Sequence, residues 1–419
     1  MNTITLIKNA RILTPSGFTV GNLLIKDGII QSITKDAIVS ENDVSNVLDA
    51  KLNMLIPGFI DIHTHGGNGL DVNSAVTDDY ASLNQFFASL GTTSYVPTII
   101  TDSHETMSNA IKNIVEAKNI QFGGSQILGI HMEGPYLCHK YKGAMPEEYL
   151  RLPNIEEFDE LQQTAKGNII HITIAPELEG SVDFVREVAK SGVSVAVGHT
   201  EASYEQTMEC IENGADHATH TFNAMKMMHH RGPAVLGAVL DSDVTAEIIC
   251  DGEHVDPVMV RILKKIKGVD RLVAVTDSIM ATGLPDGRYK LGVNDIDVEN
   301  GNAWLTNEYS TRAGSVLVMI EAFRNMIEFT DISISDASKI FSRNPARVIG
   351  VDGSKGEIRV GMDADLILLD DDLNLTATIV LGNLCYEKEV VGESSVSVVS
   401  EQECNEGGYL LDSDVFKLY

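Results

Sequence analysis

LIPGFIDIHTH, residues 55–65, is the stretch of sequence that decides the fold. An apolar run of strand length leads into two histidines, His63 and His65, with Thr64 between them. Because side chains alternate along a strand, both imidazoles point to the same side. Two imidazoles on one side at the end of a strand form a metal-chelating arrangement. On this motif alone, a pair of satisfied core histidines is the alternative interpretation.

Seven further strand-like runs follow, and amphipathic stretches of helical period separate most of them. Alternating strands and helices predict parallel strands, and eight such units predict a (β/α)8 barrel. The eight runs are residues 55–65, 93–100, 127–135, 169–177, 194–200, 217–223, 245–252 and 271–278. The helical stretches are 78–91, 103–118, 181–192, 203–214 and 256–268, and further helices are expected in 311–330 and 333–350.

Both ends of the chain have a different pattern from the middle. Short apolar runs cut by Gly, Asn and Asp fill residues 1–55, and residues 356–386 repeat that style. We therefore expect an α/β chain in which residues 56–350 form a TIM-like barrel and residues 1–55 and 351–388 together form a small β-sandwich. Residues 389–419 turn acidic and are expected to be a C-terminal extension.

The composition excludes several classes of function. A net charge of −29 over 419 residues argues against nucleic acid and anionic membranes as partners. No apolar run approaches the length of a membrane span, and the N-terminus lacks the pattern of a signal peptide. Five scattered cysteines without a CxxC pair fit a reduced cytoplasm. An anionic substrate would need a local group of positive charges against this overall field.

Metal-binding and catalytic residue types collect where the predicted strands end. Barrel enzymes carry their catalytic groups at the C-terminal ends of the strands, so these residues would share one mouth. Taken singly, each has an ordinary structural explanation, such as a helix cap, a core histidine or an ion pair. Imidazole and carboxylate ligands without thiolate suit Zn²⁺ or Fe²⁺. The residues are His63, His65, Glu133, His199, His217, His220, His254 and Asp277.

Such a cluster predicts metal-assisted hydrolysis. One or two divalent ions would lower the pKa of a water and polarise a substrate carbonyl. Asp277, the lone carboxylate at the end of the eighth strand, is placed to accept a proton from that water and to pass it to a leaving group.

Several motifs together resemble the N-acetylglucosamine-6-phosphate deacetylases of the amidohydrolase superfamily. The resemblance runs from the N-terminus to about residue 388. The motifs are HTH at 63–65, HMEGP at 131–135, GHT at 198–200, HTFNAM at 220–225, HHRGP at 229–233, DGEHV at 251–255, TDS at 276–278, GLPDGRYKLG at 283–292 and AGS at 313–315.

The resemblance implies a role for individual residues. Glu133, His199 and His220 would hold the principal metal, and His63 and His65 would hold a second ion with Glu133 bridging. Asp277 would be the acid/base. The substrate would be a phosphorylated amino sugar, with Arg231 on its 6-phosphate and His254 on a sugar hydroxyl. Asn223 and Ala224 would offer backbone groups, and Ala144, Arg312 and Ala313 would line the sugar pocket. The family also implies a homodimer.

Two residues depart from the family pattern. The family usually has a histidine after Gly143-Ala144, where this chain has Met145, which cannot donate a hydrogen bond. An apolar residue is usual before AGS, where this chain has Arg312. Either His139 or another nearby group substitutes for the missing histidine, or the substrate differs. N-acetylgalactosamine 6-phosphate is therefore the first alternative substrate. The others are a different amide, such as a cyclic amide or dipeptide, and a sugar-phosphate binding protein that has lost catalysis.

Overall fold

The protein is described here by a computed structural model that covers residues 3–35, 44–120 and 122–388. Residues up to Glu387 form one unit, and the expected extension at 389–419 lies outside the described residues. No helix among the described residues combines the length and the hydropathy that crossing a membrane requires.

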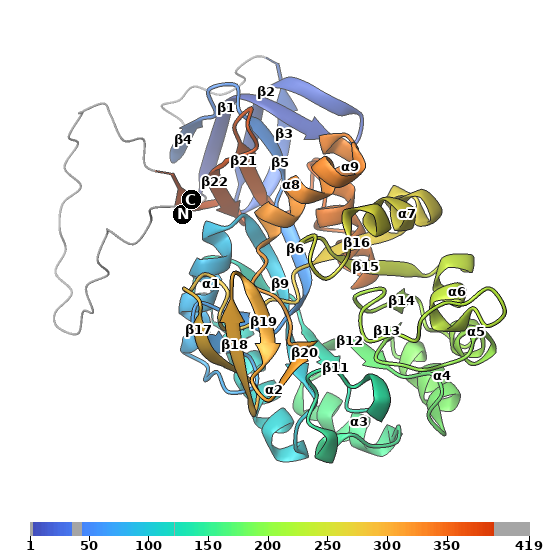
Figure 1. Cartoon of the computed structure of the whole chain (residues 1–419). Coiled ribbons are helices and arrows are strands. Elements are labelled where there is room, and N and C mark those ends of the chain that lie inside the picture. Colours follow the sequence, from blue (N-terminus) through green and yellow to red (C-terminus); the bar gives the residue numbers. More distant parts are fainter. Residues whose placement is uncertain (1–2, 36–43, 121, 389–419) are drawn as a thin grey trace. The chain divides into compact units, whose positions relative to one another are not determined.

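Eight parallel strands form the barrel, which confirms the predicted fold class (Figure 1). The barrel closes at its mouth between the first and last strands, where the Asp277 N–H donates to the His63 carbonyl at 2.9 Å and the His65 N–H to the Ser278 carbonyl at 2.7 Å. A short strand, β10 (Gln126–Ile127), pairs with β9 on the same edge as β11, so it is the first part of the third barrel strand. The barrel strands are β6 (Phe59–Thr64), β9 (Thr92–Ile100), β11 (Ile130–Glu133), β12 (Ile169–Ile174), β13 (Ser194–Val197), β14 (His217–Ala218), β15 (Thr245–Ile249) and β16 (Leu272–Val275).

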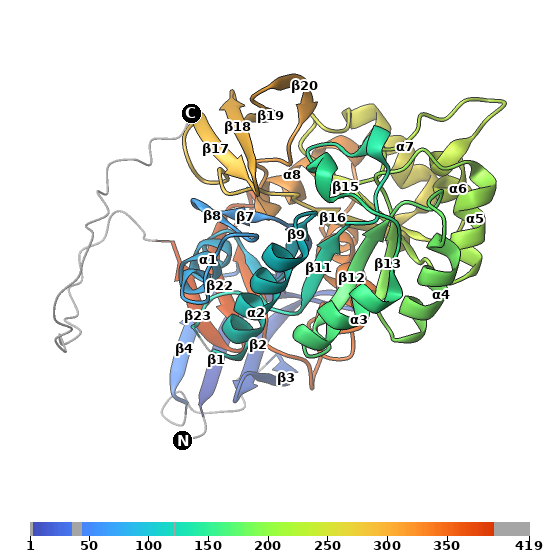
Figure 2. The ribbon, with the colours of Figure 1, turned by 90° about the horizontal axis from the view of Figure 1, so that it is seen from below.

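Helices surround the barrel (Figure 2). In α4, for example, Phe184, Val185 and Val188 are buried on one side of the helix, which matches the period of an amphipathic helix. The helices are α1 (Asp79–Ser89), α2 (His104–Asn119), α3 (Ile155–Thr164), α4 (Ser181–Lys190), α5 (Tyr204–Glu212), α6 (Ala234–Asp241), α7 (Pro257–Lys267), α8 (Met319–Thr330), α9 (Ile334–Ser338) and α10 (Asn344–Val348).

The prediction of one strand over residues 55–65 is wrong, because the chain divides at Gly58. Residues before it form β5 (Met54–Pro57), which pairs with β1 and β21, and residues after it form β6 of the barrel. A Cβ on Gly58 would come within 2.1 Å of the Thr93 side chain, so only glycine fits there. This glycine is the link between the two sheets.

Strands from both chain ends form a second sheet, and its buried side chains make a core separate from that of the barrel. Seven strands follow one hydrogen-bonded order, β23-β22-β21-β5-β1-β2-β3, and β4 pairs with β1. The bounds are β1 (Ile4–Thr14), β2 (Gly17–Lys26), β3 (Ile29–Thr34), β4 (Asn46–Asp49), β21 (Leu366–Leu369), β22 (Leu375–Val380) and β23 (Asn383–Glu387).

A four-stranded antiparallel sheet is inserted between the last barrel strand and α8, and we did not predict it. Its last strand contains Thr311 and Arg312, so the expected helix over residues 311–330 begins only at Met319. Figures 1 and 2 place the inserted sheet and the sheet from the chain ends on different sides of the barrel. The inserted strands are β17 (Gly287–Leu291), β18 (Asn294–Glu299), β19 (Asn302–Leu305) and β20 (Glu308–Arg312).

Candidate metal centre and substrate cavity

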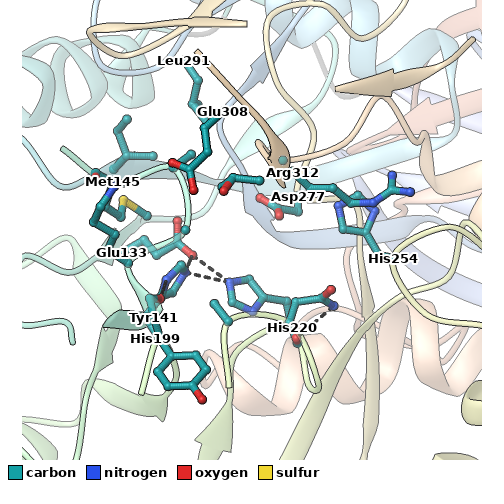
Figure 3. A pocket seen from close by; sticks show the side chains of 18 of the residues that line it. Glu133, Tyr141, Met145, His199, His220, His254, Asp277, Leu291, Glu308 and Arg312 are labelled. Carbon is teal, nitrogen blue, oxygen red and sulfur yellow. Dashed lines mark hydrogen bonds and ion pairs between the residues drawn. The ribbon is translucent and has the colours of Figure 1, made fainter. Parts of the chain in front are cut away.

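Three side chains from three barrel strands meet at one point of the mouth (Figure 3). His199 Nε2, His220 Nε2 and Glu133 Oε1 lie 3.0 Å from one another. The Tyr141 carbonyl lies 2.8 Å from His199 Nδ1. A carbonyl only accepts hydrogen bonds, so a neutral His199 ring carries its proton on Nδ1 and presents a lone pair at Nε2.

These three atoms have the chemistry of a metal site. Without a proton between them, the two imidazole nitrogens and the carboxylate oxygen would repel one another at this spacing, and a cation removes that repulsion. Imidazole and carboxylate donors suit Zn²⁺ and Fe²⁺. Glu133, His199 and His220 are all buried, so the residues present fit a divalent ion.

A second set of possible ligands adjoins the first and shares Glu133 with it. His63, His65 and Glu133 offer ligand atoms within 4.8 Å of one another. Asp277 Oδ1 lies 3.0 Å from His65 Nε2 and 3.5 Å from His63 Nε2. The two sets together could therefore hold one or two ions, with the Glu133 carboxylate between them.

In this cluster, burial and the neighbouring charges shift the pKa values of the side chains in opposite directions. Burial alone would lower the pKa of His65, but hydrogen bonds to Asp277 and Glu133 outweigh it and raise that pKa to about 9. Burial would likewise raise the pKa of Glu133, and the neighbouring His63, His199 and His220 hold it well below its usual range. Burial would also raise the pKa of Asp277, but its hydrogen bond to His65 and the charges of His63 and His65 together lower that pKa. Both carboxylates are therefore ionised at neutral pH, as metal ligands and proton acceptors must be.

Three residues of the cluster have an unfavourable backbone conformation at the ends of the barrel strands. The φ angles of His199, His220 and Asp277 are +47°, +25° and +52°, in the region that disfavours residues with a Cβ. Backbone in this region costs on the order of 1–3 kcal/mol per residue and gathers at functional sites. We expect such backbone strain where the orientation of a side chain serves a functional site, and His199, His220 and Asp277 fit that expectation.

A cavity of about 570 Å³ opens directly above the cluster. One part of its wall is the loop after β11, which includes His139, Tyr141 and Met145, and another part is the inserted sheet, which includes Trp304 and Glu308. Of the residues predicted from the sequence, the lining includes His65, Glu133, Ala144, His199, His220, Asn223, Ala224, His254, Asp277 and Arg312.

Two predicted substrate contacts lie away from this cavity. Arg231 is exposed and its Nη1 contacts the neighbouring His230 ring at 2.8 Å. Ala313 is fully buried behind the lining, next to Gly314, which does line the cavity. Both assignments came from the family pattern alone, and neither residue reaches the cavity within this one chain.

The two residues that depart from the family pattern, Met145 and Arg312, each have well-defined contacts with neighbouring side chains. Met145 is 4% exposed and packs in an apolar cluster with Leu137 and Leu291. Arg312 lies 4.5 Å above the Trp304 ring and donates to Asn302 and Glu253. His139, a possible substitute donor, lines the cavity and contacts Glu147 at 3.4 Å.

Sequence reasoning missed several residues that shape the site. Trp304 and Glu308 belong to the unpredicted inserted sheet, although the single tryptophan of the chain was a usable signal. Glu247 lies in the middle of an apolar run and contacts three buried histidines, among them His63. Nothing in the sequence places its partners, because they come from other strands.

Comparisons with known proteins agree with this architecture. Residues 54–385 match the model of the amidohydrolase family. The chain is 36% identical to N-acetylglucosamine-6-phosphate deacetylase of Bacillus subtilis (strain 168), over 91% of this chain and 97% of the relative. It is 34% identical to N-acetylgalactosamine-6-phosphate deacetylase of Escherichia coli O157:H7, over 90% and 98%. The crystal structure of N-acetylglucosamine-6-phosphate deacetylase from Pasteurella multocida superposes with a TM-score of 0.85 at 33% identity, covering 91% of this chain and 99% of that one.

Proposed function

Because this chain belongs to the amidohydrolase family, in its N-acetylglucosamine-6-phosphate deacetylase branch, we propose that it hydrolyses the acetamide of N-acetylglucosamine 6-phosphate. The products are glucosamine 6-phosphate and acetate. The observation that carries this proposal is the meeting of Glu133, His199 and His220 beside Asp277 at the floor of one cavity.

The family implies a divalent metal, and Glu133, His199 and His220 would hold it, with His63 and His65 available for a second ion. We propose Zn²⁺ or Fe²⁺. When bound, the ion supplies a water of lowered pKa and polarises the acetamide carbonyl.

Asp277 carries the proton transfers in this proposal. Its carboxylate is ionised, lines the cavity and lies against the metal-facing histidines. It accepts a proton from the attacking water and then donates it to the nitrogen of the leaving amine as the C–N bond breaks. The His254 ring is fixed by Asp251, whose carboxylate lies 2.6 Å from His254 Nδ1, so its Nε2 remains for a sugar hydroxyl.

Charge at the cavity favours a phosphorylated substrate. The whole chain carries a net charge of −29, yet Lys140, Lys142 and Arg312 line the cavity wall. These are the cations that a phosphate ester can contact in the cavity, and two of them, Lys140 and Arg312, also pair with Glu201 and Glu253. Arg231 does not line the cavity of its own chain, so we propose that it contacts the 6-phosphate bound by the partner chain of the dimer proposed below.

N-acetylgalactosamine 6-phosphate is the second candidate substrate. Met145 and Arg312, which depart from the family pattern, both line the cavity. The overall identities of 36% and 34% to relatives with the two activities are too similar to decide between the sugars. The choice therefore depends on the cavity wall.

We further propose a cytoplasmic homodimer. The four cysteines among the described residues are free, which suits a reducing compartment. Met227 and Met228, on the loop that carries Arg231, are 76% and 55% exposed. A partner chain that covers this loop would remove that apolar surface from water, and light scattering of the purified protein measures the dimer directly.

Acetate release from both N-acetylhexosamine 6-phosphates tests the function, with added Zn²⁺ and with a chelator. Chelator-sensitive release that favours the gluco sugar is the expected result. Preference for N-acetylgalactosamine 6-phosphate would support the proposed reaction but would make that sugar the substrate. Absence of release from both sugars by metal-loaded protein would refute the proposed function.

A further inference from the structure

Two of the imidazoles at the metal centre are oriented by backbone carbonyls. His65 Nδ1 lies 3.1 Å from the Thr98 carbonyl, and His199 Nδ1 lies 2.8 Å from the Tyr141 carbonyl. Each carbonyl accepts the Nδ1 proton of a neutral ring and leaves Nε2 free to face the metal. No side-chain substitution can remove these two acceptors.

The other two metal-facing histidines depend on one side chain, Glu247. Its Oε2 lies 3.1 Å from His63 Nδ1 and accepts the backbone N–H of His220 at 2.8 Å. His220 Nδ1 itself has no hydrogen-bond partner among the described residues. Glu247 therefore does for His63 what a carbonyl does for His65, and it also holds the strained backbone of His220.

The surroundings of Glu247 show that this carboxylate is fixed. Glu247 is fully buried inside the barrel, and its described ion-pair partners are all histidines. The opposite oxygen, Oε1, faces His217 Nε2 at 3.1 Å and His171 Nε2 at 3.6 Å. His171 and His217 lie outside the two ligand sets around Glu133, and with Glu247 they form a third group whose possible ligand atoms lie within 4.8 Å of one another. Glu247 therefore connects two groups: it contacts His63 and His220 of the metal centre, and it contacts the buried His171 and His217, which we call the lower polar layer.

We propose that Glu247 is a positioning residue that fixes the tautomer of His63 and thereby builds the second metal subsite, formed by His63, His65 and Glu133. With the proton held on Nδ1, His63 presents a lone pair at Nε2 toward Glu133 and Asp277, at 3.4 Å and 3.5 Å. Without an acceptor at Nδ1, the ring is free to carry its proton on Nε2, where that proton would occupy the place of the ion. This inference does not depend on which sugar is the substrate.

Zinc titration of metal-stripped protein, with bound ions counted by mass spectrometry, tests the proposal in three variants. Glu247→Met removes the acceptor at nearly constant volume, so we expect two ions per chain in the unmutated protein and one in E247M. The second ion should bind roughly 10- to 100-fold more weakly, as for other residues that orient a ligand. Glu247→Gln keeps an amide oxygen that can accept from His63 and His220 while its NH2 group faces His217, so E247Q should recover the second ion.

His171→Met is the matched control, because it changes a buried polar residue of the same layer that touches Glu247 and none of the four metal-facing imidazoles by hydrogen bond. It should keep both ions. The proposal is overturned if E247M binds two ions with unchanged affinity, if H171M loses the same ion, if E247Q behaves like E247M, or if the unmutated chain binds one ion only.

A measurement on the unmutated protein covers the case in which E247M does not fold. In ¹⁵N-histidine spectra of the zinc-loaded chain, we expect a slowly exchanging Nδ1–H signal that is absent from His63→Asn. Coordination of zinc through His63 Nδ1 would overturn the proposal. Acetate release is measured separately, so an inactive protein with two ions would count against the proposed function and leave this inference standing.

Discussion

The barrel mouth and the inserted sheet face the same cavity, but they hold their side chains by different means. At the mouth, buried groups are fixed by strand ends, by backbone hydrogen bonds such as the one from the Asp277 N–H to the His63 carbonyl, and by one buried carboxylate, Glu247. In the inserted sheet, Arg312 is held by other side chains, namely Trp304, Asn302 and Glu253. We therefore propose that the register of the parallel strands sets the chemistry, whereas side chains of the inserted sheet select the substrate.

Changing the proton carrier at the mouth should have the largest effect. Asp277→Asn keeps the shape of the side chain but cannot accept the proton of the attacking water, so kcat should fall roughly 100- to 10,000-fold. Steady-state kinetics with metal analysis checks this result, because Glu133, His199 and His220 should still hold the ion. A variant that keeps most of its activity would mean that another group carries the proton.

Substitution of Arg312 in the inserted sheet should weaken substrate binding more than it slows the chemical step. Arg312→Met removes a cation from the cavity wall and with it the contact to the substrate that we propose, and a hydrogen bond to a charged group contributes about 1.5 kcal/mol. We expect KM to rise roughly 10-fold with a smaller change in kcat. Arg288→Met is the control, since Arg288 lies in the same sheet, pairs with Asp297 at 2.9 Å and does not line the cavity. Equal effects of both substitutions would refute a direct role for Arg312.

Metal removal should make the stability of the mouth depend on pH. In the metal-free chain, the pKa of His65 is raised to about 9. The resulting stabilisation is complete below the ordinary histidine pKa of about 6.5 and is lost as pH rises through about 9. Tm of the chelated protein should therefore fall across this window while that of the zinc-loaded protein should not. Parallel Tm curves in differential scanning calorimetry would contradict this reasoning.

Substitution of Met145, in the loop after β11, should have the smallest effect. Met145→His places an imidazole donor where the family usually has one, so it should shift the ratio of kcat/KM for the two sugars by a few-fold, or about 1 kcal/mol. Met145→Leu, which keeps the apolar cluster with Leu137 and Leu291, should leave the ratio unchanged. Competition assays with both sugars measure it, and an unchanged ratio in M145H would show that position 145 does not select the sugar.

The same contrast explains what could be predicted from the sequence. Strand ends in a parallel barrel share one face, so histidines that follow several of the apolar runs are enough to indicate a common mouth. The inserted sheet escaped prediction because its strands are short and two of them, β17 and β20, are mostly exposed: in β17, Gly287, Arg288 and Lys290 face water. Such strands lack the apolar alternation that reveals a half-buried strand.

The contacts of Glu247 and the place of Arg231 could not be predicted for another reason. Glu247 meets His63 across 184 positions of sequence, and only the closed barrel brings them together. The family pattern suggested Arg231 as a phosphate contact, but Arg231 does not line the cavity of this chain, and its guanidinium contacts His230. A motif identifies a residue type, whereas the fold decides what that residue can reach.

A crystal structure of the zinc-loaded Asp277→Asn variant with N-acetylglucosamine 6-phosphate would test the division between mouth and wall most directly. We expect zinc between Glu133, His199 and His220, the acetamide carbonyl facing that ion, and the sugar ring against β20 near Arg312. A sugar bound away from the barrel mouth, or an acetamide facing the inserted sheet instead of the metal, would contradict the assignment of chemistry to the mouth and of selectivity to the wall.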